Sequence, residues 1–329
     1  MFTRWGRFVH RRRWAVLVTG GVLVALAAVG GAGVFGSLSD GGFEDPDSEA
    51  VRAGAQIERT VGRTDADAIA LYRSDRWSVD DPEFEQAVTG TLAALPRDRV
   101  ARVVSFYDTE SPALVSADRH ATYVVVTMAG SDEEEIFDNF EAVRGDLAAP
   151  GLDTQVGGMP AVFADLNDQV AEDIARAEMI SMPVLLLLCL LIFGSAVAAV
   201  LPVAVGAIAI VGAFALLRVM TEIGDVSVFA INIITLLGLG LAIDYALFVV
   251  SRFREELAAG RDVDDAVART MATAGRTVAF SGLTIAAALA SLLLFPQNFL
   301  RSMGFGGMAA VLVAMAAALT VLPAVLGLL

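Results

Sequence analysis

Long apolar runs alternate with one long polar stretch along the chain. A membrane-spanning helix needs about 20 apolar residues to cross roughly 30 Å of hydrocarbon. The first such run, 14–36, follows a short basic segment at 1–13. A cleaved signal peptide is the alternative interpretation, but the run is longer than the roughly 7 to 15 apolar residues of a signal core, which favours a retained helix. Five more spans are predicted within 178–329, at residues 179–194, 196–218, 226–251, 275–296 and 302–326.

The polar stretch, 37–177, has its own order of elements. Period-2 and period-3.6 patterns predict, in chain order, a strand at 66–72, a helix at 82–95 after Asp81, strands at 99–107 and 120–128, a helix at 132–147 with Ser131 as N-cap, and a strand at 152–156. The order βαββαβ is that of the ferredoxin-like fold. Flanking helices are expected at 48–60 and 161–178, and the second of these is expected to continue into the second span after the turn at Gly157-Gly158. The predicted fold class is therefore an α+β membrane protein, a bundle of six transmembrane helices with one extracytoplasmic ferredoxin-like domain between helices 1 and 2.

The composition and charge of the chain support a division into apolar membrane segments and one polar domain. The 329 residues are 56% hydrophobic, with a mean hydropathy of +0.65, which is typical of a multi-pass membrane protein. The stretch 37–177 holds 29 Asp and Glu residues against 11 arginines, and the chain has no lysine. An acidic domain argues against nucleic acid as a partner, because phosphate binding needs clustered cations.

Arginine placement predicts the orientation in a bacterial inner membrane. The loop between the fourth and fifth predicted spans is rich in arginine, whereas the two short loops on the other side hold only Arg218 and Arg301. The arginines of the rich loop are Arg252, Arg254, Arg261, Arg269 and Arg276. The positive-inside rule then makes the N-terminus cytoplasmic and the acidic domain extracytoplasmic.

Few residues suit enzymatic or metal chemistry. Cys189 is the single cysteine, and His10 and His120 are the only histidines. An internal disulfide and a His-rich metal site are therefore excluded, and a Ser-His-Asp hydrolase would have to use His120. We expect no enzyme activity, no metal and no cofactor, with protons as the coupling ion.

Asp244 is the residue that suggests a function. It lies in the middle of the fourth predicted span, where a carboxylate costs about 2.5 to 3.5 kcal/mol on insertion scales. On a helical wheel, Gly240 and Ser251 fall within about 40° of Asp244, which predicts a face turned toward protein rather than lipid. A structural acid paired with arginine is the alternative, but Arg252 and Arg254 lie two turns or more away. We interpret Asp244 as a proton relay, with Tyr245 beside it as a possible hydroxyl partner.

Small and hydroxylated residues accompany this acid. Thr277, Ser281 and Thr284 follow one another at i, i+4 and i+7 in the fifth span and form a stripe that could support the relay. The equal alternative is that these hydroxyls join helices or bond their own i−4 carbonyls. Gly238 and Gly240 lack the G-x-G-x-x-G continuation of a nucleotide site, and close helix packing explains them better.

Several long motifs together resemble a known family. The stretches 227–257, which contains AIDYALFVV, and 275–307, with GGFEDPDSEA at 41–50 and FGSAVAAVLPVAVG at 193–206, are similar to the MmpL branch of the resistance-nodulation-division (RND) transporters of actinobacteria. The resemblance implies one helix, a periplasmic porter domain of ferredoxin-like folds and five further helices. It also implies export of lipids, glycolipids or other hydrophobic compounds toward the cell envelope, driven by the proton motive force. The family's Asp-Tyr relay falls on Asp244 and Tyr245.

The length of the chain departs from the family pattern. The family is a tandem duplication of about twelve helices whose second Asp-Tyr pair faces the first, whereas this sequence stops at Leu329, near the end of a sixth helix. The expected partners are membrane lipids, a lipid or other hydrophobic substrate, and a second six-helix half. That half could be the remainder of a longer chain, which the abrupt apolar end favours, or a separate polypeptide, or a second copy. The alternative function is that of a non-transporting or export-assisting member of the RND and sterol-sensing superfamily.

Overall fold

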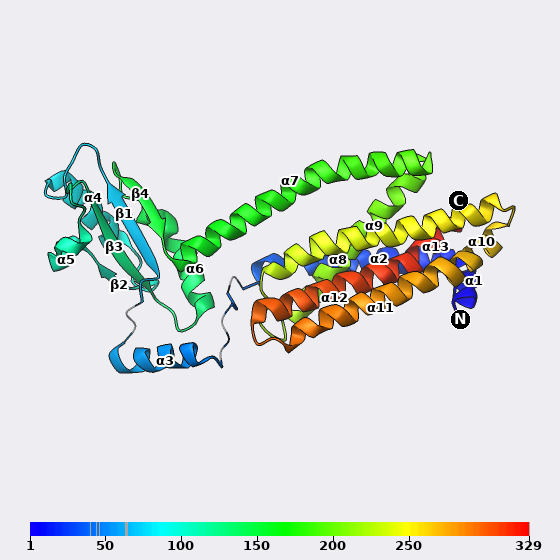
Figure 1. The fold of residues 1–329 in the computed structure, drawn as a ribbon, viewed down its shortest axis with the longest axis horizontal. Helices are drawn as coiled ribbons and strands as arrows, with labels where there is room; N and C mark the ends of the chain where they lie inside the picture. Colours follow the sequence, from blue (N-terminus) through cyan, green and yellow to red (C-terminus); the bar gives the residue numbers. More distant parts are fainter. Residues whose placement is uncertain (40, 44, 46, 63–64, 329) are drawn as a thin grey trace. The chain divides into compact units, whose positions relative to one another are not determined.

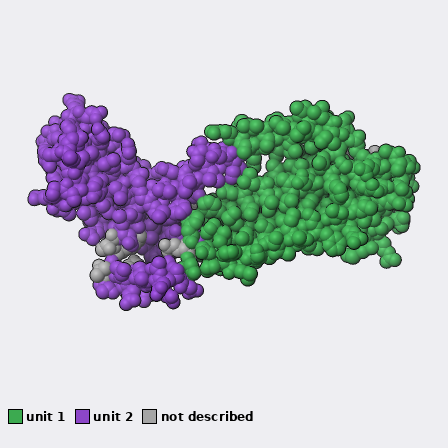
Figure 2. Space-filling model, viewed as in Figure 1, with its two compact units in different colours: residues 1–39, 43–45, 176–329 green, residues 40–42, 46–175 purple. Residues whose placement is uncertain are grey.

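The computed structural model describes residues 1–39, 41–43, 45, 47–62 and 65–328. The chain forms two compact units (Figure 2). Unit 1 comprises residues 1–39, 43–45 and 176–329, and unit 2 comprises residues 40–42 and 46–175. Both units have a hydrophobic core of their own. The end of the predicted membrane segment, Leu329, lies outside the described residues.

Unit 2 is built on a four-stranded antiparallel sheet (Figure 1). Its strands are β1 (Ala68–Arg73), β2 (Val100–Val104), β3 (Ala121–Met128) and β4 (Asp153–Gly157). They lie side by side in the order β2-β3-β1-β4, with α4 (Pro82–Ala94) following β1 and α6 (Glu133–Val143) following β3. This arrangement confirms the predicted ferredoxin-like fold.

Alternation along the strands places the core on one face of this sheet. In β1, Ala68, Ala70 and Tyr72 are fully buried, and they belong to the same core as Phe84 of α4 and Phe140 of α6. The residues between them, Ile69 and Leu71, point the other way and keep 38% and 36% of their surface exposed. The two helices therefore cover one face of the sheet, and the other face presents apolar side chains on the surface of the described part of unit 2.

Two predicted elements of unit 2 are wrong in detail. The strand predicted to reach Tyr107 ends at Val104, because Ser105 accepts a hydrogen bond from Asp108 N at 3.2 Å and starts α5 (Phe106–Thr109). The N-cap of α6 is Asp132, not Ser131: Asp132 accepts from Glu135 N at 2.9 Å, and the Glu135 carboxylate accepts from Ser131 N at 2.9 Å. The helix therefore starts one residue later than a Ser131 cap would place it, and both carboxylates accept backbone N–H groups at its N-terminus.

Helices lead into and out of unit 2. α3 (Glu49–Val61) precedes the first strand and corresponds to the helix predicted at 48–60. After Gly158, whose φ of +123° favours glycine, α7 (Met159–Phe193) runs as one helix of 35 residues with Pro183 inside it. The expectation that the flanking helix continues into the second span is therefore confirmed.

Six helical segments of the described chain are long and apolar enough to cross a membrane. They are Arg13–Gly36 (α2 and the 3-10 turn η1, Ala32–Gly36), Met159–Phe193 (α7), Ala196–Met220 (α8), Phe229–Ala258 (α9), Val263–Leu294 and Asn298–Leu326. The number of predicted spans is confirmed, and α7 and α8 are separated by a short turn in which Gly194 has a φ of +61°. The protein is a multi-pass membrane protein.

The helical ends of unit 1 differ from the prediction. The segment predicted to begin at 275 begins twelve residues earlier in α10 (Val263–Thr270), continues through a π-helical turn at Met271–Gly275, and becomes α11 (Arg276–Ala290) with a final 3-10 turn, η5 (Ser291–Leu294). The last segment breaks between α12 (Asn298–Leu319) and α13 (Val321–Leu326). The basic N-terminus is itself a helix, α1 (Phe2–Arg11).

Tyr72 provides a test of the unit 2 core. Its side chain is fully buried and its hydroxyl donates to Leu147 O at 2.9 Å, while burial raises the pKa of Tyr72 to about 12. We predict that Tyr72→Phe lowers the free energy of unfolding of unit 2 by about 1–2 kcal/mol at neutral pH, because the Leu147 carbonyl loses its donor.

The same substitution should change the response to alkaline pH. A folded-state pKa above the unfolded value of about 10 contributes stability that is complete below pH 10 and is lost as the pH rises through 12. Denaturant unfolding of the wild type should therefore become easier between about pH 10 and pH 12, and more weakly so in Tyr72→Phe. Tyr123→Phe is the control, since that hydroxyl makes no hydrogen bond within the described residues; equal slopes in all three proteins would contradict the assignment.

Candidate functional site

α9 carries the candidate site and is held between two other helices. It is a continuous helix of 30 residues that packs against α8 and α12 (Figure 1). Its buried residues recur at intervals of three and four: Ala230, Ile234, Gly238, Ala242, Tyr245, Ala246, Val249, Val250 and Phe253. Four of them, Ala230, Gly238, Ala242 and Ala246, are Gly or Ala, which lets neighbouring helices approach closely in a membrane, where dispersion contacts take the place of hydrophobic burial.

Gly238 and Gly240 have different surroundings. A Cβ atom on Gly238 would lie 3.0 Å from Ala310 Cβ of α12, so this glycine belongs to a tight helix contact, as the sequence predicts. A Cβ atom on Gly240 would meet no atom within 4 Å. The packing role predicted for both glycines is therefore visible only at Gly238 in this chain.

Asp244 lies on the surface of the helical bundle. Its side chain is exposed, and it makes no hydrogen bond or ion pair with any described residue. Gly240 is exposed and Ser251 half-exposed on the same side of α9, so the helical wheel groups these residues correctly. The helices of this chain cover the opposite face of α9 and leave this one open, so the protein expected to cover this face is not part of the described chain.

Tyr245 lies in a different environment from its neighbour. It is 6% exposed and belongs to the apolar core formed with α8 and α12, and its hydroxyl has no hydrogen-bond partner in the described structure. One step along the helix turns the side chain by about 100°, which accounts for the difference. A buried phenol without a partner costs free energy and is available to bond a group that enters the core.

The arginines nearest in sequence have other partners. Arg252 pairs with Glu255 at 2.6 Å and with the buried Glu256, which also accepts from Arg261 Nε at 2.5 Å. The Arg254 guanidinium lies 5.7 Å from the centre of the Phe193 ring. Sequence inspection misses the buried carboxylate at Glu256, although an arginine four residues before it and another five after it are the signal for such a cluster.

The hydroxyl stripe of α11 does not join Asp244 in the described structure. Thr277 donates to Thr273 O at 3.4 Å and Thr284 to Phe280 O at 2.8 Å, both within their own helix, and both side chains are exposed. Ser281 is half-buried, and α11 packs on α12. For the two threonines, the geometry is that of the structural alternative, a hydroxyl bonded to its own i−4 carbonyl.

His120 has a structural position in the described part of unit 2. His120 Nδ1 lies 3.1 Å from Ser74 O and 3.0 Å from Trp77 O, so this ring ties together two loops of unit 2. No group of three or more His, Cys, Asp or Glu side chains suited to a metal ion occurs among the described residues.

Comparison with known proteins gives the family. Residues 42–329 match the MMPL family. The chain belongs to this family. Among MMPL-family relatives, a protein of Mycobacterium tuberculosis (strain ATCC 25618 / H37Rv) named trehalose monomycolate exporter MmpL3 is 37% identical over 341 residues, which cover 100% of this chain and 36% of the relative. One of Mycolicibacterium smegmatis named mycolic acid-containing lipids exporter MmpL11 is 31% identical, over 97% of this chain and 34% of the relative.

A third MMPL-family relative extends the similarity beyond mycobacteria. A membrane protein of Streptomyces coelicolor is 40% identical over 332 residues, which cover 99% of this chain and 46% of the relative. The present chain thus spans between about a third and about half of the length of these relatives. It corresponds to the N-terminal half of an MmpL transporter of the RND superfamily, as the motifs predict.

The two glycines of α9 allow a matched test of helix packing. We predict that Gly238→Val destabilises the bundle by about 1–3 kcal/mol, because the new side chain must displace Ala310. Gly240→Val makes the same change in helix propensity, but in this chain its side chain meets open space. We expect its free energy of unfolding, from thermal unfolding in detergent, to stay within about 0.5 kcal/mol of the wild-type value. Equal melting temperatures for the two variants would refute the contact.

Proposed function

We propose that the chain is one half of a proton-driven exporter of lipids or other hydrophobic compounds, and that Asp244 is its proton-carrying group. The observation that carries the proposal is the open face of α9, where an exposed carboxyl lies in an apolar segment with no cationic partner among the described residues. The names of two relatives, which describe exporters of a mycolate glycolipid and of mycolic acid-containing lipids, support the class of substrate.

The position of Asp244 requires a second protein surface. A carboxylate facing hydrocarbon costs about 2.5–3.5 kcal/mol on insertion scales, so a face that presents one is normally covered by protein or water. Gly240, one turn away, has no atom within 4 Å of its Cβ position, which leaves room for another helix to approach closely. We assign this face to contact with a second six-helix half, since transporters built from repeats place their ion sites between the halves.

A carboxyl at such an interface can couple proton movement to a change of packing. Such a group can take up a proton on one side of the membrane and release it on the other when the packing of the two halves changes its access to water. Each proton that crosses the membrane releases about 2.3 kcal/mol per 100 mV. The hydroxyl of Tyr245, the next residue in the chain, has no partner among the described residues and is available to bond a water molecule or polar group that enters the core.

The arrangement of charged elements supports the proposed orientation. α1 packs on α10, and Arg7 of α1 lies 3.4 Å from Asp265 of α10, so the basic N-terminus and the arginine-rich loop are at the same end of unit 1. The positive-inside rule assigns this end to the cytoplasm and unit 2 to the extracytoplasmic side. The open apolar face of the unit 2 sheet, with Ile69 and Leu71, is then a surface for a second porter domain.

Asp244→Asn tests the proposed function directly. In the complete transporter we predict that this isosteric change lowers the rate of lipid export from vesicles with an imposed proton gradient by about 100-fold or more, because the amide cannot carry a proton. The matched control is Asp225→Asn, which removes an exposed acid from the loop before α9 and should export normally. Export by Asp244→Asn at the rate of the control, at equal amounts of folded protein in the membrane, would overturn the relay.

A further inference from the structure

The N-terminal helix α1 has three distinct faces. Gly6 and Val9 are buried against the bundle, and a Cβ on Gly6 would lie 3.0 Å from Ala268 Cα of α10. Trp5 and Phe8 remain 40% and 51% exposed, with ring centroids 5.6 Å apart. The third face carries the exposed arginines Arg4, Arg7 and Arg11. Such a helix, basic on one side and aromatic on the other, is typical of the boundary between headgroups and acyl chains.

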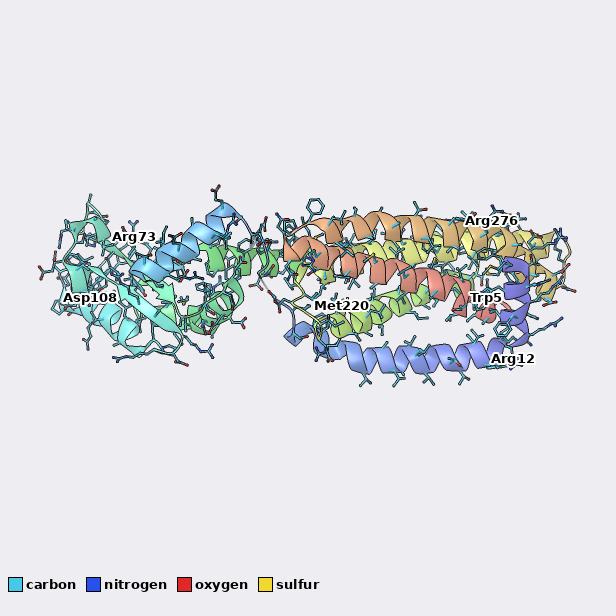
Figure 3. All side chains as sticks on the ribbon, turned by 90° about the horizontal axis from the view of Figure 1, so that it is seen from below. Trp5, Arg12, Arg73, Asp108, Met220 and Arg276 are labelled. Atoms are coloured by element: carbon cyan, nitrogen blue, oxygen red, sulfur yellow. The ribbon has the colours of Figure 1, made fainter. Side chains whose placement is uncertain are left out.

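The direction of α1 fits that location. The backbone breaks at Arg12, which has φ −105° and ψ 21°, and α2 begins at Arg13. Figure 3 shows α1, between the labelled Trp5 and Arg12, running across the end of the bundle rather than along its helices. Because the bundle helices cross the membrane, α1 lies along one membrane surface, beside the C-terminal end of α12.

A break in the last span creates a cavity beside α1. Thr320 leaves helical geometry at φ −124°, and Pro323 has no N–H to offer to Leu319 O four residues earlier. Trp5 supplies the missing donor, with Nε1 at 2.8 Å from Leu319 O. The indole thereby fixes α1 against the end of α12, and an open groove of about 730 Å³ lies between the two helices.

The lining of this groove combines one cation with apolar surface. The residues that matter are Phe2, Arg4, Trp5 and Phe8 of α1 with Leu319 and Thr320 at the end of the last span. Arg4 makes no ion pair or hydrogen bond with any described residue, in contrast to Arg7, which pairs with Asp265. Residues 1–13 contain no acid, so nothing within α1 competes for the Arg4 guanidinium.

An apolar track leads away from the groove along α12. Ala316 lines the cavity, and Leu312, four residues before it on the same side of the helix, is 39% exposed. A ligand with an anionic head at Arg4 can therefore extend a hydrocarbon tail past Leu319 and along α12 toward the middle of the bilayer.

We propose that this cavity binds one anionic phospholipid of the leaflet in which α1 lies. The phosphate accepts hydrogen bonds from Arg4, the glycerol region lies over Trp5 and Thr320, and one acyl chain follows Ala316 and Leu312. Charge complementarity and the position at the membrane surface select this occupant over a peptide or a free anion, neither of which matches a single cation followed by a hydrocarbon path.

The test compares two arginines of the same helix. The whole protein is purified in mild detergent, exchanged into phosphatidylglycerol or phosphatidylcholine, and examined by native mass spectrometry for lipid retained per chain. Arg4→Gln should weaken retention of phosphatidylglycerol by about tenfold, the loss of one charge-assisted contact. Arg11→Gln removes the same charge from an exposed position outside the cavity and should retain the lipid as the wild type does.

The possible outcomes separate the site from general attraction. The proposal is supported if the wild type retains one phosphatidylglycerol per chain, Arg4→Gln loses it and Arg11→Gln keeps it. Both variants change the surface, and unchanged melting temperatures will show that they fold. Equal loss in the two variants, or equal retention of phosphatidylcholine, overturns it in favour of unspecific binding. Displacement by inorganic phosphate alone, or a cross-link from this face to a second copy of the chain, also overturns it.

Discussion

The close packing of α9 between α8 and α12 determines which surfaces the rest of unit 1 can present. Helices in lipid gain no hydrophobic free energy by associating, so the contact relies on small residues that bring the backbones together. At two of these contacts a Cβ atom would come too close to the facing side chain: Gly238 of α9 lies against Ala310 of α12, and Gly206 of α8 lies against Leu239 of α9. With one side of α9 committed to these contacts, the side that carries Asp244 is left for another partner.

Two adjacent residues therefore acquire opposite surroundings. Tyr245 enters an apolar core in which its hydroxyl has no partner among the described residues, and Asp244 faces outward where its charge has no counter-ion among them. Neither polar group therefore has, among the described residues, a partner that offsets the free-energy cost of its surroundings. A partner that covers the open face would remove the carboxyl from solvent and would have to supply polar groups that contact it.

Much of the fold can be predicted from the sequence because its signals are long-range and repeated. Apolar runs of span length predict the six membrane segments, and the βαββαβ order predicts the sheet of unit 2 without any knowledge of strand pairing. The errors occur where one side chain or one missing hydrogen bond decides the outcome. Ser105 and Asp132 start helices by accepting a backbone N–H, and the break at Thr320 depends on Pro323 and on Trp5, far away in the sequence.

The residues that share a face with Asp244 can be predicted from the sequence, but the exposure of that face cannot. A helical wheel places Gly240, Asp244 and Ser251 on one face, and no feature of the sequence tells whether α8, α12 or another protein covers that face. The helix α1 was missed for a related reason: its apolar residues are interrupted by arginines, and its fold depends on contacts with α10 and the end of α12.

The π-helical turn at Met271–Gly275 separates two surfaces that a regular helix would keep in phase. Before the turn, α10 packs on α1, with Ala268 next to Gly6. After the turn, α11 packs on α12, and its residues Val278, Gly282 and Ala286 are buried. One residue more or less in an α-helix rotates everything beyond it by about 100°, and a wide turn absorbs such a change locally. Related chains can therefore differ by a single residue between α10 and α11 without losing either contact surface, and alignments of this family should tolerate a gap there.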